Sequence, residues 1–489
     1  MQGLLQSTLR DSPLIMPEVM LAFFGLAILL TDFLLETKQK AWNALTAALG
    51  VIFSALALWL LKPLAAISAE GFHGAIVIDP FFMLFGFIFL AATLLVIFLS
   101  VRYLEIEDEH HGEYYALMLF STVGMMFLAC GNDLVTLFIA LETMAISFYI
   151  LSGFLRRDRR SNEGALKYVL LGAFSSGILA YGFSLLYGIS GSTNLNTIAT
   201  VLAQRPHGDL MVVIAVMTVS AGVFFKIAAV PFHQWAPDVY EGAPTPITAY
   251  VSVASKTASF ALLLRLYLGV FWPVRMDWTA LLTAVAILSM TVGNLAAITQ
   301  TNIKRLLAYS SISHVGYILL GLVAGNERGL QAMMFYLFTY AFFNTGAFAI
   351  VIVLRRKGVI GDEMEDLNGL SQRNPGAAIL MLIFLLSLAG VPPTAGFVGK
   401  LLIFWALIET GHTKLAVLAV LYILPAVYYY FRMIAAMWSR EATDQVRPRI
   451  SIGQAVALAA MVLVTLAAGV YPEPFLRLAT YSLLTPFGR

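Results

Sequence analysis

Long apolar runs, separated by short charged or Gly- and Pro-rich segments, follow one another along almost the whole chain. A helix that crosses a bilayer needs about 20 mostly apolar residues, within a range of roughly 17–25. The pattern therefore predicts an all-α polytopic membrane protein with about fourteen transmembrane helices. The predicted spans cover residues 14–35, 42–61, 78–101, 114–131, 133–155, 163–189, 209–236, 245–271, 278–299, 303–324, 330–354, 375–409, 414–438 and 452–471.

The composition agrees with a place in the lipid bilayer. The chain is 60% hydrophobic and 12% charged, with a mean hydropathy of +0.84, whereas soluble proteins carry about a quarter charged residues. The single cysteine, Cys130, excludes a disulfide framework, a Cys-ligated zinc site and an iron–sulfur cluster. The sequence has no Walker A, GxGxxG or GxSxG motif and no pair of histidines typical of haem ligation. We therefore expect no redox centre or other cofactor in this chain.

Basic residues in the loops predict how the chain is oriented, because cytoplasmic loops are enriched in Lys and Arg. One set of alternate loops carries 16 of the 30 Lys and Arg residues. The other set, together with both termini, carries 8, and the remaining 6 lie inside predicted spans. This bias predicts an even number of spans, with both termini on the outer, periplasmic side of the membrane.

Short sequence matches indicate an internal repeat. TVG at 122–124 recurs at 291–293, and SAGVFFK at 220–226 matches TAGFVGK at 394–400. Spans 4–8 and 9–13 would then be two copies of a five-helix unit, and the odd number makes the second copy inverted, as in many ion-coupled transporters. The predicted organisation is helices 1–3 in 1–113, the first repeat in 114–271, the inverted second repeat in 278–438, and helix 14 with the C-terminus in 452–489.

Spans seven and twelve contain helix breakers. Pro231 interrupts span seven, and Pro392 and Pro393 interrupt span twelve. Proline removes a backbone donor and leaves carbonyl groups free, and in a membrane such groups must face protein or water-filled space. We therefore predict that helices 7 and 12 are broken at functional positions.

Four ionisable residues lie deep inside predicted spans: Glu142, Lys226, Lys256 and Lys400. A charge at the bilayer centre costs about 2.5–3.5 kcal/mol even on lenient insertion scales, and such residues usually mark ion or proton pathways. Glu142 is the obvious counter-charge for a lysine. These residues predict a path for protons, although buried ion pairs of purely structural value are the alternative for each of them.

Five further residues are weaker candidates for a functional role. Lys167 lies near a span end, where its side chain could reach water. His314 and His233 titrate near neutral pH, but a hydrogen-bonded core histidine is equally consistent with either position. Arg265 and Arg432 are interpreted as packing or lipid-interface residues.

Three segments resemble a known family. VPFHQWAPDVYEGAPTPITAYVSVASK (230–256) resembles the core signature of the antiporter-like subunits of respiratory complex I and of Mrp-type cation/proton antiporters. LIMPEVMLAFFGLAILLTD (14–32) and LAGVPPTAGFVGK (388–400) look like the subunit N branch of bacterial proton-translocating NADH:quinone oxidoreductase. A glutamate in place of Lys400 would suggest subunit M, and the short segment after span fourteen differs from the long lateral helix of subunit L. The resemblance covers essentially the whole chain.

The resemblance implies a mechanism and partners. Glu142 would pair with Lys226, Lys167 would modulate that pair, Lys256 would be the central lysine, and Lys400 would lie on the outward route. The chain would be a proton-translocating subunit of the bacterial inner membrane, coupled to quinone reduction elsewhere in the complex. It would contact lipid, antiporter-like subunit M and the small subunits K and J, and no nucleic acid. NADH, FMN, iron–sulfur clusters and quinone would belong to partner subunits.

Two alternatives remain open from the sequence. A stand-alone or Mrp-type Na⁺/H⁺ antiporter would use the same lysines. A structural membrane spacer would carry buried ion pairs whose loss disrupts assembly rather than coupling.

Overall fold

The structure is a computed structural model that describes residues 10–35, 40–356, 359, 361–441 and 449–483. Thirteen helices in these residues are long and apolar enough to cross a membrane. They are Ser12–Leu34, which contains α2 (Met16–Thr31), α3 (Trp42–Leu60), α5 (Pro80–Glu107), α6 (Gly112–Cys130), α7 (Leu134–Ser152), α8 (Arg159–Ser190), α10 (Leu210–Ile227), the continuous helix Thr245–Val270, Trp272–Ile298, which contains α14 (Arg275–Ile298), α15 (Ile303–Ala324), α16 (Glu327–Leu354), Thr413–Ser439, which comprises α20 (Thr413–Leu421) and α21 (Ile423–Ser439), and α22 (Ile452–Val470).

Shorter elements connect these helices or lie against them. The segment between α3 and α5 contains a small antiparallel hairpin, in which Ala69 pairs with Ile78. The short elements are η1 (Ser12–Ile15), η2 (Asp32–Leu34), α4 (Lys62–Ala65), β1 (Ala69–Gly71), β2 (Ile76–Ile78), α9 (Leu195–Leu202), α11 (Trp235–Gly242), η6 (Trp272–Val274), η7 (Met364–Leu367), α17 (Leu370–Arg373), α18 (Pro375–Ala389), α19 (Ala395–Glu409) and α23 (Glu473–Tyr481).

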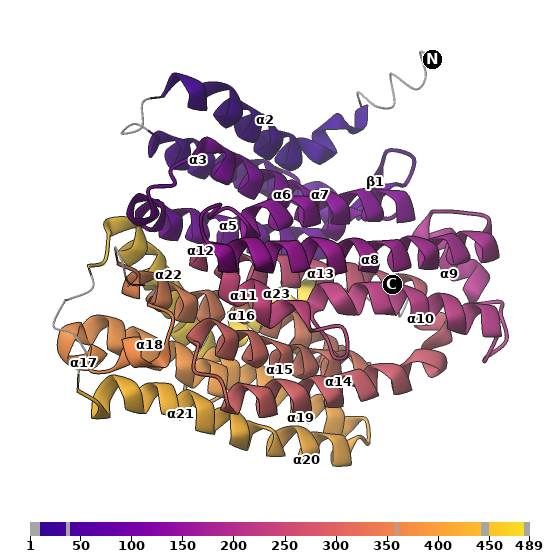
Figure 1. Cartoon of the computed structure of the whole chain (residues 1–489). Coiled ribbons are helices and arrows are strands. Elements are labelled where there is room, and N and C mark those ends of the chain that lie inside the picture. The colour runs from indigo at the N-terminus through magenta and orange to yellow at the C-terminus, as the bar shows by residue number, and fades with distance from the viewer. Residues whose placement is uncertain (1–9, 36–39, 357–358, 360, 442–448, 484–489) are drawn as a thin grey trace.

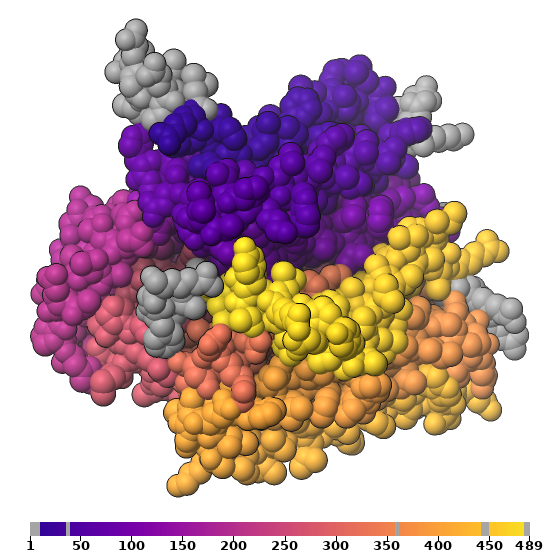
Figure 2. All heavy atoms as spheres, turned by 180° about the vertical axis from the view of Figure 1, so that it is seen from behind, coloured from indigo at the N-terminus to yellow at the C-terminus, as the bar shows by residue number. Residues whose placement is uncertain are grey.

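The long helices run side by side, and the chain crosses the bundle from one edge to the other. Figure 1 shows α2 and α3 at one edge and α20 and α21 at the opposite edge. The last two helices return to the middle of the far face, as the yellow spheres in Figure 2 show, where α22 packs against α16 and α5. The predicted all-α membrane fold is therefore confirmed. Residues 1–9 and 484–489 lie outside the described residues, so the predicted side of both termini stays a prediction.

Helices 7 and 12 are broken, as the prolines predict. Ala228 has a left-handed backbone and ends α10, and the next helix, α11, begins only at Trp235. In span twelve, α18 ends at Gly390, which has φ +83, and α19 begins at Ala395. Each half of span twelve has 15 residues, too few for a helix to cross a bilayer alone. This break explains why fourteen predicted spans correspond to thirteen long helices.

The centre of the bundle is formed by three helices that are buried along almost their whole length. They are Thr245–Val270, α15 and α16. The first of these consists of α12 (Thr245–Tyr250), the π-helical η4 (Val251–Ser255), α13 (Lys256–Leu264) and the π-helical η5 (Arg265–Val270). Because π-bulges are frequent at functional sites, the one directly before Lys256 draws attention to that lysine.

Arg265 and Arg432 are both held by protein oxygens. Arg265 forms a two-point ion pair with Asp79, at 2.6 and 2.9 Å, and also donates to the carbonyl of Ala129. Asp79 in turn caps α5 by accepting from Phe82 N at 2.8 Å. Arg432 donates to the carbonyl of Ile298 at 2.7 Å and to that of Gln300. These contacts favour the packing alternative for both arginines over the lipid-interface alternative, because their guanidinium groups bind backbone and carboxylate oxygens.

We expect Arg265→Met to destabilise the fold by about 3–5 kcal/mol, because it leaves the Asp79 carboxylate buried without its partner. The Arg265 and Asp79 side chains are only 7% and 9% exposed. The measurement is the yield of folded protein extracted in detergent and its thermal midpoint. The control is Arg477→Met, which breaks an ion pair with Glu473 whose side chains are 79% and 52% exposed, and which should change little. Equal effects of the two substitutions would contradict the assignment.

Candidate functional site

Glu142 and Lys226 lie on adjacent parts of the first half of the bundle. The Glu142 carboxylate accepts from Ser176 Oγ at 2.5 Å, and Lys226 Nζ donates to Tyr149 Oη at 3.3 Å. Lys226 is buried, whereas Glu142 is partly exposed on this isolated chain. Within the described residues the two side chains form no ion pair within 4.0 Å. Instead of the expected direct pair, hydroxyl groups hold both.

Aromatic rings connect Lys226 to the half-helix α11. Tyr149 meets Tyr168 edge-to-face with ring centroids 4.7 Å apart. Tyr168 then stacks flat on Trp235, the first residue of α11, with centroids 4.5 Å apart and planes 7° from parallel. Trp235 Nε1 donates to the carbonyl of Phe225 at 2.8 Å, next to Lys226 in sequence. At the break in helix 7 the Phe225 carbonyl accepts from Trp235 as well as from Ala228 N, and α11 lies against the surroundings of Lys226.

Lys256 lies at the centre of the bundle. It is buried on helix Thr245–Val270, and its Nζ donates to Ser311 Oγ at 2.6 Å. The Tyr240 ring of α11 lies 5.6 Å from the same Nζ. In the described residues no carboxylate lies within 4.0 Å of this ammonium. A hydroxyl and an aromatic ring are thus its nearest polar surroundings.

One face of α15 connects Lys256 with Lys400. Ser311, His314 and Tyr317 are spaced three residues apart, and about 4.5 Å of helical rise separates neighbours. The Tyr317 ring lies 4.9 Å from Lys400 Nζ, and both lysines act on His314 through space. Each His314 ring nitrogen meets a tyrosine hydroxyl, Nδ1 that of Tyr336 at 2.7 Å and Nε2 that of Tyr430 at 3.3 Å. His314, one of the weaker candidates, thus lies between the two lysines.

The break in helix 12 supplies the oxygen atoms that bind Lys400. Lys400 Nζ donates to the carbonyls of Leu388 and Ala389 at 2.9 and 3.1 Å, at the C-terminal end of α18. Free carbonyls at a helix C-terminus carry partial negative charge and favour a cation. A Cβ at Gly390 would lie 2.9 Å from Lys400 Cδ, so glycine at this left-handed position also makes room for the lysine.

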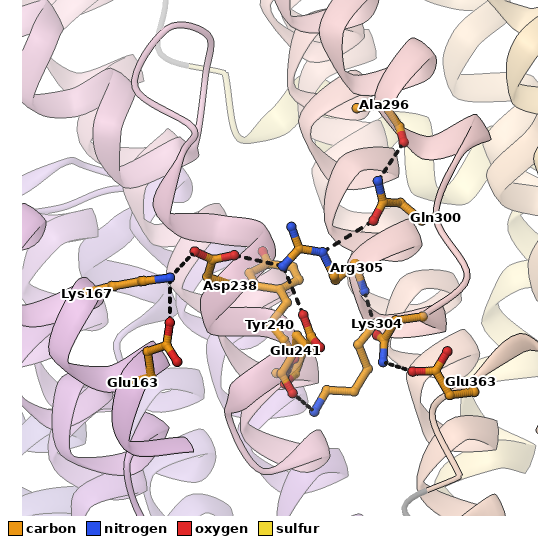
Figure 3. Close-up of polar contacts among 12 residues, drawn as sticks. Glu163, Lys167, Asp238, Tyr240, Glu241, Ala296, Gln300, Lys304, Arg305 and Glu363 are labelled. Atoms are coloured by element: carbon orange, nitrogen blue, oxygen red, sulfur yellow. Dashed lines mark hydrogen bonds and ion pairs between the residues drawn. The ribbon is translucent and has the colours of Figure 1, made fainter. Parts of the chain in front are cut away.

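Lys167 is placed away from the other lysines. Its Nζ forms ion pairs with Asp238 at 2.7 Å and with Glu163 at 2.9 Å, at one end of the bundle. Figure 3 shows the Asp238 carboxylate between Lys167 and Arg305, whose Nη1 donates to it at 2.8 Å. The side chain of Lys167 is 43% exposed. The structure therefore brings Lys167 to α11 rather than to Glu142.

His233 and the prolines lie in the breaks themselves. His233 is half-buried between α10 and α11, and its Nδ1 has no polar partner in the part of the chain that the structure describes. Pro231, Pro392 and Pro393 are at non-helical positions. Among the described residues, no contact joins His233 to Lys226.

Sequence reasoning missed several residues that surround the lysines. Tyr149 and Ser311 are ordinary residues in apolar runs, and Tyr240 lies in the polar segment between Asp238 and Glu241, so nothing in the sequence shows that they contact lysines. Glu18 could have been found from the sequence, since it is a charged residue that follows a proline inside an apolar run. It is buried on α2, and among the described residues its carboxylate has no partner other than its own backbone amide.

This arrangement suits proton exchange. Amines, an imidazole and hydroxyl groups can each give up or accept a proton, and such groups surround Lys226, Lys256 and Lys400. Within the described residues no group of three or more His, Cys, Asp or Glu side chains could hold a metal ion.

Comparisons with known proteins identify the family of the chain. The family model described as NADH:quinone oxidoreductase/Mrp antiporter, TM matches residues 131–424. The chain is 56% identical to NADH-quinone oxidoreductase subunit N 2 of Solibacter usitatus, over 96% of this chain and 97% of that protein. It is 50% identical to subunit N 1 of Koribacter versatilis, over 97% and 95% of the two chains. A chain in the structure of respiratory complex I from Thermus thermophilus with bound aureothin is 32% identical, with a TM-score of 0.80 and coverage of 95% and 100%. The chain therefore belongs to the subunit N family of NADH-quinone oxidoreductase, within the antiporter-like membrane subunits of complex I.

Proposed function

We propose that this chain carries protons across the membrane through Glu142, Lys226, Lys256 and Lys400, driven by quinone reduction in other subunits of the complex. The observation that carries the proposal is that the three lysines are buried and are bound by neutral oxygens. An ammonium held in this way is costly, so its neutral form is accessible when the surroundings change. Ser311 and Tyr317, on one face of α15 with His314 between them, contact Lys256 and Lys400 respectively.

The free energies that this proposed transport requires are small. Moving one charge through 100 mV costs about 2.3 kcal/mol. The gain or loss of a nearby charge supplies a few kcal/mol at partly buried sites. A change at one end of the chain of residues can therefore favour proton transfer at the next lysine.

The proposal includes orientation and organisation. Both termini lie on the periplasmic side, so the Lys167 end of the bundle faces the cytoplasm and protons leave past Lys400. Residues 114–271 and 278–438 act as two inverted repeats, which the broken helices beside Lys226 and Lys400 support. Antiporter-like subunit M and the small subunits K and J are the proposed neighbours. NADH, FMN, iron–sulfur clusters and quinone are bound by other subunits, and this chain supplies no redox group.

The test is NADH-driven acidification of inverted membrane vesicles from a Lys226→Ala strain, in sodium-free medium. We expect the complex to assemble on a native gel and acidification to fall by roughly tenfold or more, because a positioned proton-transfer group contributes about 10²–10⁴-fold. Quinone reduction should fall with it.

Each alternative function predicts a different result in this acidification experiment. Normal acidification by an assembled mutant would contradict the role of Lys226. Loss of assembly without a coupling defect in the residual complex would favour the structural spacer. Acidification by the wild type that requires added sodium would favour an Mrp-type Na⁺/H⁺ antiporter.

A second prediction concerns the hydroxyl that holds Lys226. A Cβ at Gly172 of α8 would lie 2.1 Å from Tyr149 Oη, whereas a Cβ at Gly177, on the same helix, meets nothing within 4 Å. Gly172→Ala should therefore displace the Tyr149 hydroxyl from Lys226 and lower acidification several-fold in assembled complex. Gly177→Ala is the matched control and should pump as the wild type does. If both variants pump normally, the Tyr149–Lys226 contact has no part in transport.

A further inference from the structure

The half-helix α11 is held by three cations that come from two different parts of the chain. Lys167 of α8 and Arg305 of α15 share the Asp238 carboxylate, one on each oxygen, at 2.7 and 2.8 Å. Arg305 also donates to Glu241 at 2.9 Å. Lys304 is buried and donates to the carbonyls of Glu241 and Ala243, at 2.6 and 2.8 Å, where a cation suits a helix C-terminus. Figure 3 shows these side chains converging on α11 from both sides.

Two aromatic side chains of α11 reach the surroundings of two buried lysines. Trp235 stacks on Tyr168, which contacts the Tyr149 ring beside Lys226. Five residues later, Tyr240 faces Lys256. A displacement of this eight-residue helix would therefore alter the surroundings of Lys226 and Lys256 together.

The backbones of α11 and α8 are in close contact, so only the charged side chains between these helices have room to move. A Cβ at Gly242 would lie 2.3 Å from the carbonyl of Arg160, and one at Gly164 would lie 3.1 Å from the carbonyl of Asp238. Beside this backbone contact lies an open pocket of about 160 Å³, lined by Glu163, Lys167, Asp238, Glu241 and Arg305 among others. The ion pairs thus border a space in which their side chains can change partner.

We propose that Asp238 is a positioning residue for proton translocation. By sharing its carboxylate between Lys167 and Arg305, it ties α8 and α15 to α11 and so holds Trp235 and Tyr240 against the groups around Lys226 and Lys256. A change of charge or partner at Asp238 loosens α11 and changes both lysine environments at once. This inference rests on the proposed transport role of the two lysines.

The experiment uses the complete purified complex with Asp238→Asn, which keeps the shape of the side chain and removes its charge. Hydrogen exchange of the peptide that covers 235–242 should be faster than in the wild type. Acidification per assembled complex should fall about threefold or more, within the range by which residues along a coupling network act. Asp238→Glu should restore much of the slow hydrogen exchange and of the acidification, because it restores the negative charge.

The matched control is Glu105→Gln, which breaks an exposed ion pair with Arg102 at 2.8 Å on another helix, and which should change neither readout. Unchanged exchange or unchanged acidification in Asp238→Asn would overturn the inference. If Asp238→Asn does not assemble, Lys167→Met removes one of the two shared cations and must give the same two changes. Lys226→Ala measured in parallel separates the outcomes, since normal pumping there would instead overturn the proposed transport function.

Discussion

Three ammonium groups are held inside this bundle by hydroxyl and carbonyl oxygens, with no carboxylate within 4.0 Å in the part of the chain that the structure describes. Such groups cannot stay in a low-dielectric interior unless polar atoms reach them. The unusual features of the fold supply those atoms. The break in helix 12 frees the carbonyls that bind Lys400, and the burial of α15 brings Ser311 to Lys256. The break in helix 7 also allows α11 to place Tyr240 beside Lys256 and Trp235 against Tyr168, which contacts the Tyr149 ring beside Lys226.

The contrast between these lysines and the arginines shows what a structural charge looks like in the same protein. Arg265 has a carboxylate partner at two points and two bonds to a backbone carbonyl, so its charge is fixed. Arginine also keeps its proton in proteins. Lys226, Lys256 and Lys400 have neutral partners and rings. That difference, rather than burial alone, separates the transport candidates from groups that hold helices together.

Much of the fold followed from the sequence, because apolar run length and proline position act locally. The spans and both helix breaks are of this kind, and so is the identification of Lys226, Lys256 and Lys400 as buried. Their partners could not be predicted. Asp79 and Arg265 are 186 residues apart, and Lys167 and Asp238 are 71 apart, so those contacts depend on how whole helices pack. The direct Glu142–Lys226 pair was expected from the family resemblance, but the structure holds each residue on a hydroxyl.

Lys256→Arg tests most directly whether a buried lysine must lose its proton during transport. The substitution keeps a positive charge beside Ser311 but supplies a group that stays protonated in proteins. The measurement is the number of protons moved per NADH oxidised by the assembled complex in sealed vesicles. If Lys256 carries protons, this ratio falls sharply although the charge is retained. A wild-type ratio would show that only the charge matters and would contradict the account.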